Sequence, residues 1–161
     1  MRIVTLSYRR KNEKNTNQLK TEYPSIRAWD TKSHKMLIPS VISMERNNIT
    51  VFPDNDPQWV SFYKFDQLEF MRGTGFHDKF GKEIFEGDIV DVDYSNDKRI
   101  NAHEKFVVNW ETDNLTFTAR FNDSTFCPGD DNILPLCIYK NEQDRLEIVG
   151  NKYENPQIMK E

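Results

Sequence analysis

Residues 74–90, TGFHDKFGKEIFEGDIV, decide the fold that this sequence predicts. Asp78-Lys79-Phe80-Gly81 fits a type I turn followed by a residue with positive φ, because aspartate bonds nearby backbone amides and glycine takes the left-handed position without steric cost. Lys82 to Phe85 then returns as a strand, and Glu86-Gly87-Asp88 makes a second turn that aims the chain back into the core. The predicted structural turn motif consists of Thr74, Gly75, Asp78, Gly81, Glu86, Gly87 and Asp88.

Short strands are predicted after this motif. Residues 90–94 alternate apolar side chains with aspartates, which is typical of a half-buried strand. Phe106 to Trp110 and Leu115 to Phe121 flank a polar turn and form the clearest hairpin of the chain. The other elements expected here are a polar loop at Ser95–Lys105, strands at Leu134–Tyr139 and Leu146–Val149, and a closing helical turn at Pro156–Lys160.

The chain before the motif also predicts short strands. Ile26 to Asp30 alternates apolar and polar residues. Phe62, Phe65 and Leu68 lie three residues apart, which suits a short helix. The further elements expected here are a return strand at Met36–Ile38, a hairpin of Val41–Met44 with Ile49–Phe52, a helical turn near Tyr63–Asp66, and a strand at Leu68–Arg72.

Many short strands joined by polar turns predict an all-β fold with few short helical turns. We expect a partly open, SH3-like barrel within residues 61–161 and a smaller β subdomain at residues 26–60. Residues 1–25 are expected to be an N-terminal extension made of a short strand and a polar linker. A doubly wound nucleotide-binding fold is not expected, because strands do not alternate with long helices.

Three separated motifs of this chain resemble the YopX family of phage and prophage proteins. They are Ile26–Asp30 followed by Lys35-Met36, then residues 74–90, and finally Leu146–Asn151 followed by Tyr153-Glu154-Asn155-Pro156. The resemblance covers roughly residues 26–158. It implies a small phage protein made in an infected or lysogenic bacterium. It implies no established activity, so there are no catalytic residues to carry over.

Composition favours a cytoplasmic protein, and the resemblance implies that the cell is the bacterial host. No apolar run approaches the roughly 18 residues that a membrane-spanning helix needs, and the apolar stretch at the N-terminus is too short for a signal peptide. The two cysteines, Cys127 and Cys137, fit a reducing compartment and are too few for a structural zinc site. The three histidines, His34, His77 and His103, show no regular ligand spacing. No cofactor is predicted.

Acidic residues near the motif raise the question of a metal site. Glu86, Asp88, Asp91 and Asp93 lie close in sequence, and hard cations bind clustered carboxylates. The solvated face of a half-buried strand explains the two-apart aspartates better, because alternation produces such pairs on any exposed face. Gly73, Gly75 and Gly81 do not match the spacing of a phosphate-binding loop, so they are interpreted as turn glycines.

Charge distribution leaves a nucleic-acid contact open. Residues 1–35 carry nine basic and three acidic side chains, a net charge of +6, whereas the other 126 residues have a net charge of −10. Arg9, Arg10 and Lys11 beside Tyr8, or Arg27 beside Trp29, could contact phosphates and stack on bases. A solvated basic head and core aromatics are the simpler interpretation, and the acidic body argues against a broad nucleic-acid surface.

These observations predict a non-enzymatic phage or prophage accessory protein that acts by protein binding, as a homo-oligomer, with a phage or host protein as a further partner. A nucleic-acid-binding phage regulator is the alternative, and a metal-dependent enzyme is the third hypothesis. No membrane association is expected.

Overall fold

The computed structural model describes residues 25–52, 60–94, 103–121 and 133–160. Over these ranges the regular structure consists of strands and short 3-10 turns, so the all-β prediction is confirmed. The chain forms two compact units, one ending at Met71 and the other beginning at Arg72. The expected N-terminal extension lies outside the described residues except for Ser25.

The first unit contains two sheets of short strands. Its elements are β1 (Ile26–Asp30), β2 (Lys35–Leu37), β3 (Val41–Ser43), β4 (Asn48–Val51), β5 (Ser61–Lys64), η2 (Phe65–Gln67) and the first part of β6 (Leu68–His77). The strands β3, β4 and β5 form an antiparallel sheet in that order. The strands β2, β1 and β6 are neighbours in a second sheet, which β7 completes. Ala28, Leu37 and Ile49 are buried at the centre of the unit.

The helical turn that we expected near Tyr63–Asp66 is misplaced. The chain is a strand through Lys64, and the 3-10 turn is confined to Phe65–Gln67. Tyr63 pairs with Ile49 of β4 and packs on the core of this unit, while Phe62 points outward. Residues 61–64 therefore form a strand, because pairing with β4 and the alternation of half-buried and exposed side chains favour it over the short helix that the three-residue spacing of the apolar residues suggested.

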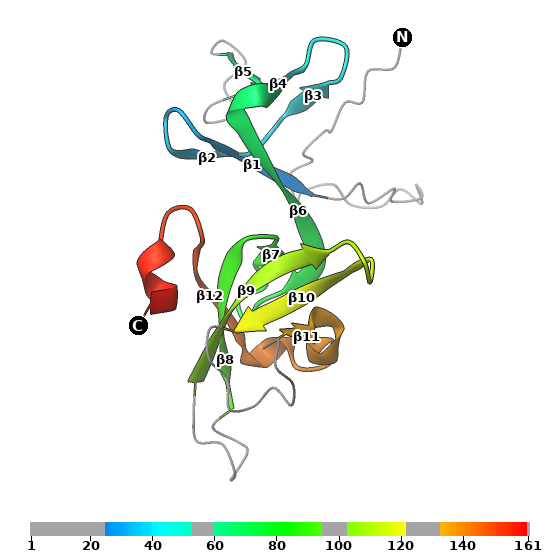
Figure 1. Cartoon of the computed structure of the whole chain (residues 1–161), viewed down its shortest axis with the longest axis vertical. Coiled ribbons are helices and arrows are strands. Elements are labelled where there is room, and N and C mark those ends of the chain that lie inside the picture. The colour runs from blue at the N-terminus through cyan, green and yellow to red at the C-terminus, as the bar shows by residue number, and fades with distance from the viewer. Residues whose placement is uncertain (1–24, 53–59, 95–102, 122–132, 161) are drawn as a thin grey trace, which may run out of the picture. The chain divides into compact units, whose positions relative to one another are not determined.

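The second unit is built on one curled sheet (Figure 1). Its strand order is β11-β10-β9-β8-β12, and the curled half-barrel that results is compatible with an SH3-like barrel. Its elements after β6 are β7 (Glu83–Phe85), β8 (Asp88–Asp93), β9 (His103–Glu111), β10 (Thr116–Phe121), β11 (Ile133–Pro135), η3 (Leu136–Tyr139), η4 (Gln143–Arg145), β12 (Leu146–Asn151) and η5 (Pro156–Lys160).

The concave side of this sheet carries the main core. Phe106 lies between Phe121 and Tyr139, with ring centroids 5.3 and 5.6 Å away, and the hydroxyls of Tyr94 and Tyr139 lie 2.6 Å apart. Apolar side chains on alternate positions of the strands supply the rest of the cluster, as expected for a sheet with one buried face. The buried members are Ile84, Val90, Val92, Tyr94, Phe106, Val108, Ala119, Phe121, Leu136, Tyr139 and Leu146.

Three further predicted elements need correction. Leu134–Tyr139 is not one strand, because Pro135 has no N–H for a ladder bond and the chain continues as the 3-10 turn η3. The loop predicted at Ser95–Lys105 is too long, since β9 already begins at His103. The strand predicted at Leu68–Arg72 runs on to His77. The hairpin of β9 and β10 and the closing turn η5 are confirmed.

None of the described residues belongs to a helix long and apolar enough to cross a membrane.

Candidate functional site

The turn at residues 78–81 is the most highly organised feature of the glycine-rich segment. Asp78 is only 6% exposed, and its Oδ1 accepts hydrogen bonds from the backbone N–H groups of Phe80 and Lys82, both at 2.9 Å. The Gly81 N–H donates to the Asp78 carbonyl at 2.8 Å, and Gly81 has φ +78. The predicted turn with a positive-φ glycine is thus confirmed.

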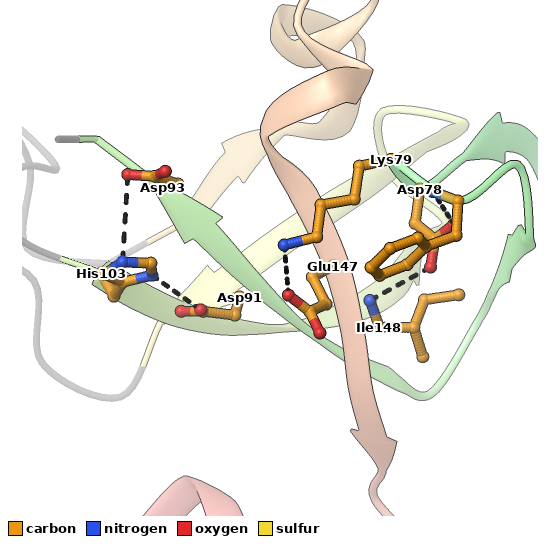
Figure 2. Close-up of polar contacts among 8 residues, drawn as sticks. Asp78, Lys79, Asp91, Asp93, His103, Glu147 and Ile148 are labelled. Atoms are coloured by element: carbon orange, nitrogen blue, oxygen red, sulfur yellow. Dashed lines mark hydrogen bonds and ion pairs between the residues drawn. The ribbon is translucent and has the colours of Figure 1, made fainter. Parts of the chain in front are cut away.

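Three contacts attach this turn to β12, and Figure 2 draws the two that involve side chains. The Lys79 N–H donates to the carbonyl of Leu146 at 2.8 Å, and the Ile148 N–H lies 3.5 Å from Asp78 Oδ2. The Lys79 Nζ lies 2.5 Å from Glu147 Oε2. The hydrogen bond to Glu147 raises the pKa of the Lys79 ammonium above its ordinary value. Because β12 is the end strand of its sheet, the turn covers part of an edge that would otherwise be open.

Phe80 projects from this rigid turn into solvent. Its side chain is 73% exposed, the highest value among the large apolar side chains that the structure describes. The Lys79 Nζ lies 5.2 Å from the centre of the Phe80 ring, and Lys82 on the other side of the turn is also exposed. The turn therefore presents an exposed aromatic side chain beside the Lys79 ammonium, on a backbone that its own hydrogen bonds hold in place.

A row of charged side chains lies beside the turn on the outward face of β8, β9 and β12 (Figure 2). His103 Nδ1 lies 2.8 Å from Asp91 Oδ2, and His103 Nε2 lies 3.9 Å from Asp93 Oδ1. Glu147 is directly opposite Asp91 in the register of β8 and β12. Both aspartates thus contact the same histidine. Asp93 is partly exposed, as expected for a solvated strand face, whereas the Asp91 side chain is only 17% exposed.

The second turn of the motif has a structural role. Gly87 has φ +83, and its N–H donates to the Val108 carbonyl at 2.7 Å while its own carbonyl accepts from Lys152 at 2.8 Å. The carboxylate of Asp88, only 1% exposed, accepts the Phe85 N–H at 2.8 Å. The turn predicted at Glu86–Asp88 is therefore confirmed, and it joins β9 to the end of β12 through backbone bonds.

The first residues of the motif lie in β6 rather than in a turn. Thr74 Oγ1 donates to the Ile84 carbonyl at 2.7 Å and accepts the Phe76 N–H at 3.1 Å. Gly75 has φ +77, and the register of β6 with β7 shifts between Gly73 and His77. Gly75 thus lies at an irregularity within the strand β6. This position fits the interpretation of Gly75 as a residue that bends the backbone, not as part of a phosphate-binding loop.

The structure does not gather the four acidic candidates into one metal site. Asp88 is buried and engaged with a backbone amide, whereas Asp91 and Asp93 lie on the outward face of the same strand. The described ranges contain no group of three histidine, cysteine or carboxylate side chains placed to hold a metal ion. Cys137 is an exposed free thiol, and Cys127 lies outside the described ranges.

Of the nucleic-acid candidates, the structure describes only Arg27 and Trp29. Arg9, Arg10 and Lys11 fall outside the described residues. Trp29 is only 7% exposed, and its ring lies 6.0 Å from that of His34 at an angle of 60°. Because the indole is buried, it is not available to stack on a base while β1 keeps this conformation.

A family model described as YopX protein matches residues 25–160. The chain belongs to the YopX family. Both turns of the motif, β12 and the closing turn η5 lie within the matched residues, so the three motifs that suggested the resemblance are all included. No curated protein matches this chain.

This YopX protein is similar to the crystal structure of protein EF1440 from Enterococcus faecalis, with 25% identity and a TM-score of 0.51. The similarity covers 85% of this chain and 98% of that chain. The neighbour therefore has nearly all of its length in a fold shared with this chain.

Two features of possible functional value were missed at the level of sequence. The exposure of Phe80 was not predicted. Its position in the middle of a tight turn was the available signal, because side chains at such positions are seldom buried in a core. The strand β5 was also missed, and with it the outward position of Phe62, which is 64% exposed. The alternation of residues 61–64 was the signal for that strand.

Proposed function

We propose that this YopX protein is a non-enzymatic phage or prophage accessory protein of the bacterial cytoplasm that acts by binding another protein, and that it self-associates. The observation that supports the binding role is the turn at residues 78–81. It holds Phe80 73% exposed, while the buried carboxylate of Asp78 fixes the backbone on both sides of it. A fixed aromatic side chain of this kind is typical of the residues that dominate protein interfaces.

The energetics of such a contact are favourable. Burying a phenylalanine side chain contributes on the order of 1.5–3 kcal/mol, and a turn that is already ordered loses little conformational entropy on binding. Charge selects the kind of partner. Lys79 is engaged with Glu147, but Lys82 makes no ion pair with any residue that the structure describes. A partner with an apolar pocket bordered by carboxylates fits this turn best.

The test is an affinity purification of the tagged full chain from a bacterium that carries the phage or prophage. Three forms are compared: the natural chain, Phe80→Ser, and the control Leu115→Ser, which changes a leucine that is 72% exposed on the β9–β10 turn. Lysates are treated with nuclease, so that proteins bridged by nucleic acid are lost. We expect a partner that the natural chain and the Leu115→Ser variant retain and that the Phe80→Ser variant retains about tenfold less.

Three results would contradict the proposal. Equal recovery by all three forms would show that Phe80 takes no part in binding. Loss of every partner after nuclease treatment, together with a salt-dependent shift of DNA or RNA by the purified protein, would favour the nucleic-acid-binding regulator instead. Metal bound stoichiometrically to the purified protein would favour the third hypothesis, a metal-dependent enzyme.

A further inference from the structure

An open strand edge lies in the first unit. Within the described residues β5 ends the sheet β3-β4-β5, with β4 on one side. In an antiparallel sheet, alternate residues of an end strand point their N–H and C=O groups away from the sheet. The four residues Ser61–Lys64 therefore offer an unpaired edge, which is a template for another strand.

The outward face of β5 is apolar at its centre. Phe62 is 64% exposed and lies opposite Thr50 of β4, which in turn lies opposite Val41 of β3. Val60, next to the strand, is 40% exposed. On the other face, Tyr63 packs against the core of the unit. A strand added to this edge with its core-facing side chains on the same side would extend the core. It would also extend the outward row formed by Val41, Thr50 and Phe62.

The same edge of a second copy satisfies these conditions. Side chains alternate between the two faces of a strand. If odd-numbered residues of one copy lie opposite odd-numbered residues of the other, the core-facing side chains of both copies stay on one side of the sheet. Centred on Phe62, this register places the two Phe62 rings side by side, Ser61 opposite Tyr63, and Val60 opposite Lys64. Lys64 is the only charged residue of β5, so this arrangement puts no like charges opposite each other. A parallel pair would place the two Lys64 side chains together.

The edge of β3 is a weaker alternative. It has three residues, all half-buried, and no outward aromatic side chain. Pairing of β3 with β5 between copies would also be heterologous and would lead to open chains of molecules, whereas β5 with β5 closes as a dimer.

We propose that two copies of this chain associate through antiparallel pairing of their β5 strands about a two-fold axis at Phe62. This inference specifies the surface of the self-association included in the proposed function and does not depend on the Phe80 turn. The partner of this edge is a second copy of the chain.

The experiment measures the mass of the full chain by light scattering over a range of concentrations. We expect a dimer for the natural chain. Phe62→Lys and Phe62→Glu each place like charges at the two-fold axis and remove the aromatic pair, so each should raise the dissociation constant about tenfold or more. An equimolar mixture of these two variants should recover the dimer, because the opposite charges then meet. Phe80→Lys, which changes a phenylalanine of the other unit that is also largely exposed, should leave the mass unchanged.

Each other outcome overturns a defined part of the inference. A natural chain that is monomeric at all concentrations refutes both the β5 dimer and self-association, and leaves the binding role of Phe80 standing. A dimer that survives both Phe62 substitutions refutes the β5 edge but not self-association. Dissociation by each variant without recovery in the mixture refutes the register centred on Phe62. Because Phe62 is exposed, circular dichroism spectra that match those of the natural chain will show that the variants remain folded.

Discussion

Buried carboxylates that cap turns organise this protein at the scale of single residues. Asp78 and Asp88 accept backbone N–H groups from within four residues in sequence, and both were assigned to turns from the sequence alone. Asp30 behaves in the same way at the β1–β2 turn, where it accepts from the backbone of Lys32 and Ser33 and from the Ser33 hydroxyl. Such short-range contacts depend on residue type and spacing, so they are predictable without a structure.

Gly81 tests the backbone of the Phe80 turn. It has φ +78, and an added Cβ would meet no atom within 4 Å, so a substitution is opposed by backbone strain rather than by a clash. We expect Gly81→Val to lower the free energy of unfolding by about 1–3 kcal/mol. Gly81→Asn is the control and should lose less, because asparagine tolerates the left-handed region. Urea unfolding monitored by circular dichroism measures both, and equal losses for the two variants would refute the strain argument.

Asp30 gives a test in acid. Its pKa lies below the ordinary value of 3.8, chiefly because the Ser33 hydroxyl donates a hydrogen bond to the carboxylate. A pKa that is lower in the folded state means that the carboxylate stabilises the fold above pH 3.8, and that this contribution disappears as the pH falls through the folded-state pKa.

We therefore expect the melting temperature of the natural chain to fall more steeply below about pH 4 than that of the Asp30→Asn variant, because asparagine does not titrate. Ser33→Ala should show an intermediate slope, because it removes the largest cause of the shift. Melting curves recorded at several acidic pH values provide the measurement. Parallel curves for all three proteins would show that the Asp30 hydrogen bonds do not stabilise the charged form.

At the scale of elements, the β9–β10 hairpin contains an unusual residue at its turn. Leu115 has φ +49 and is 72% exposed, although this conformation normally favours glycine or asparagine. The natural leucine therefore carries a steric cost without a compensating core contact. The positive φ of Leu115 was not predictable from the sequence. Asn114 comes directly before it, and an asparagine is the residue that would be expected to adopt the left-handed conformation in this turn.

Replacing Leu115 should stabilise the hairpin. We expect Leu115→Asn to raise the free energy of unfolding by about 1 kcal/mol, since asparagine adopts the left-handed region more readily. Leu115→Val is the opposite control, because a β-branched side chain is less tolerant of positive φ, and it should lower the same free energy. Chemical denaturation of the three proteins gives the comparison. A Leu115→Asn variant less stable than the natural chain would contradict the strain at this turn.

Most elements were predictable where alternation and turn chemistry agreed. The hairpin of β9 and β10, the strand β8 and both motif turns belong to this group. The errors have two sources. Residues 61–64 are a strand because β4 lies beside them, and that pairing is not visible in a local window of sequence. The strand at Leu134–Tyr139 could have been rejected from the sequence, because Pro135 lies within it and cannot donate a ladder bond.

At the scale of the whole molecule, the two units carry different surfaces. The first unit has the open edge of β5 with Phe62, and the second has the ordered turn with Phe80. The sequence predicted a binding protein, but it could not identify either surface, because exposure depends on which strands pair. Self-association through one unit and partner binding through the other would let a dimer present two copies of the Phe80 turn, and paired sites increase avidity.

The most direct test of the binding role is site-specific photo-crosslinking inside a bacterium that carries the phage or prophage. A photoreactive phenylalanine analogue is incorporated in place of Phe80 in one protein and in place of Leu115 in a matched control, two positions that are 73% and 72% exposed. The account predicts that light produces one discrete protein adduct from position 80 that is absent from position 115. The same set of adducts from both positions, or no adduct from position 80, would contradict it.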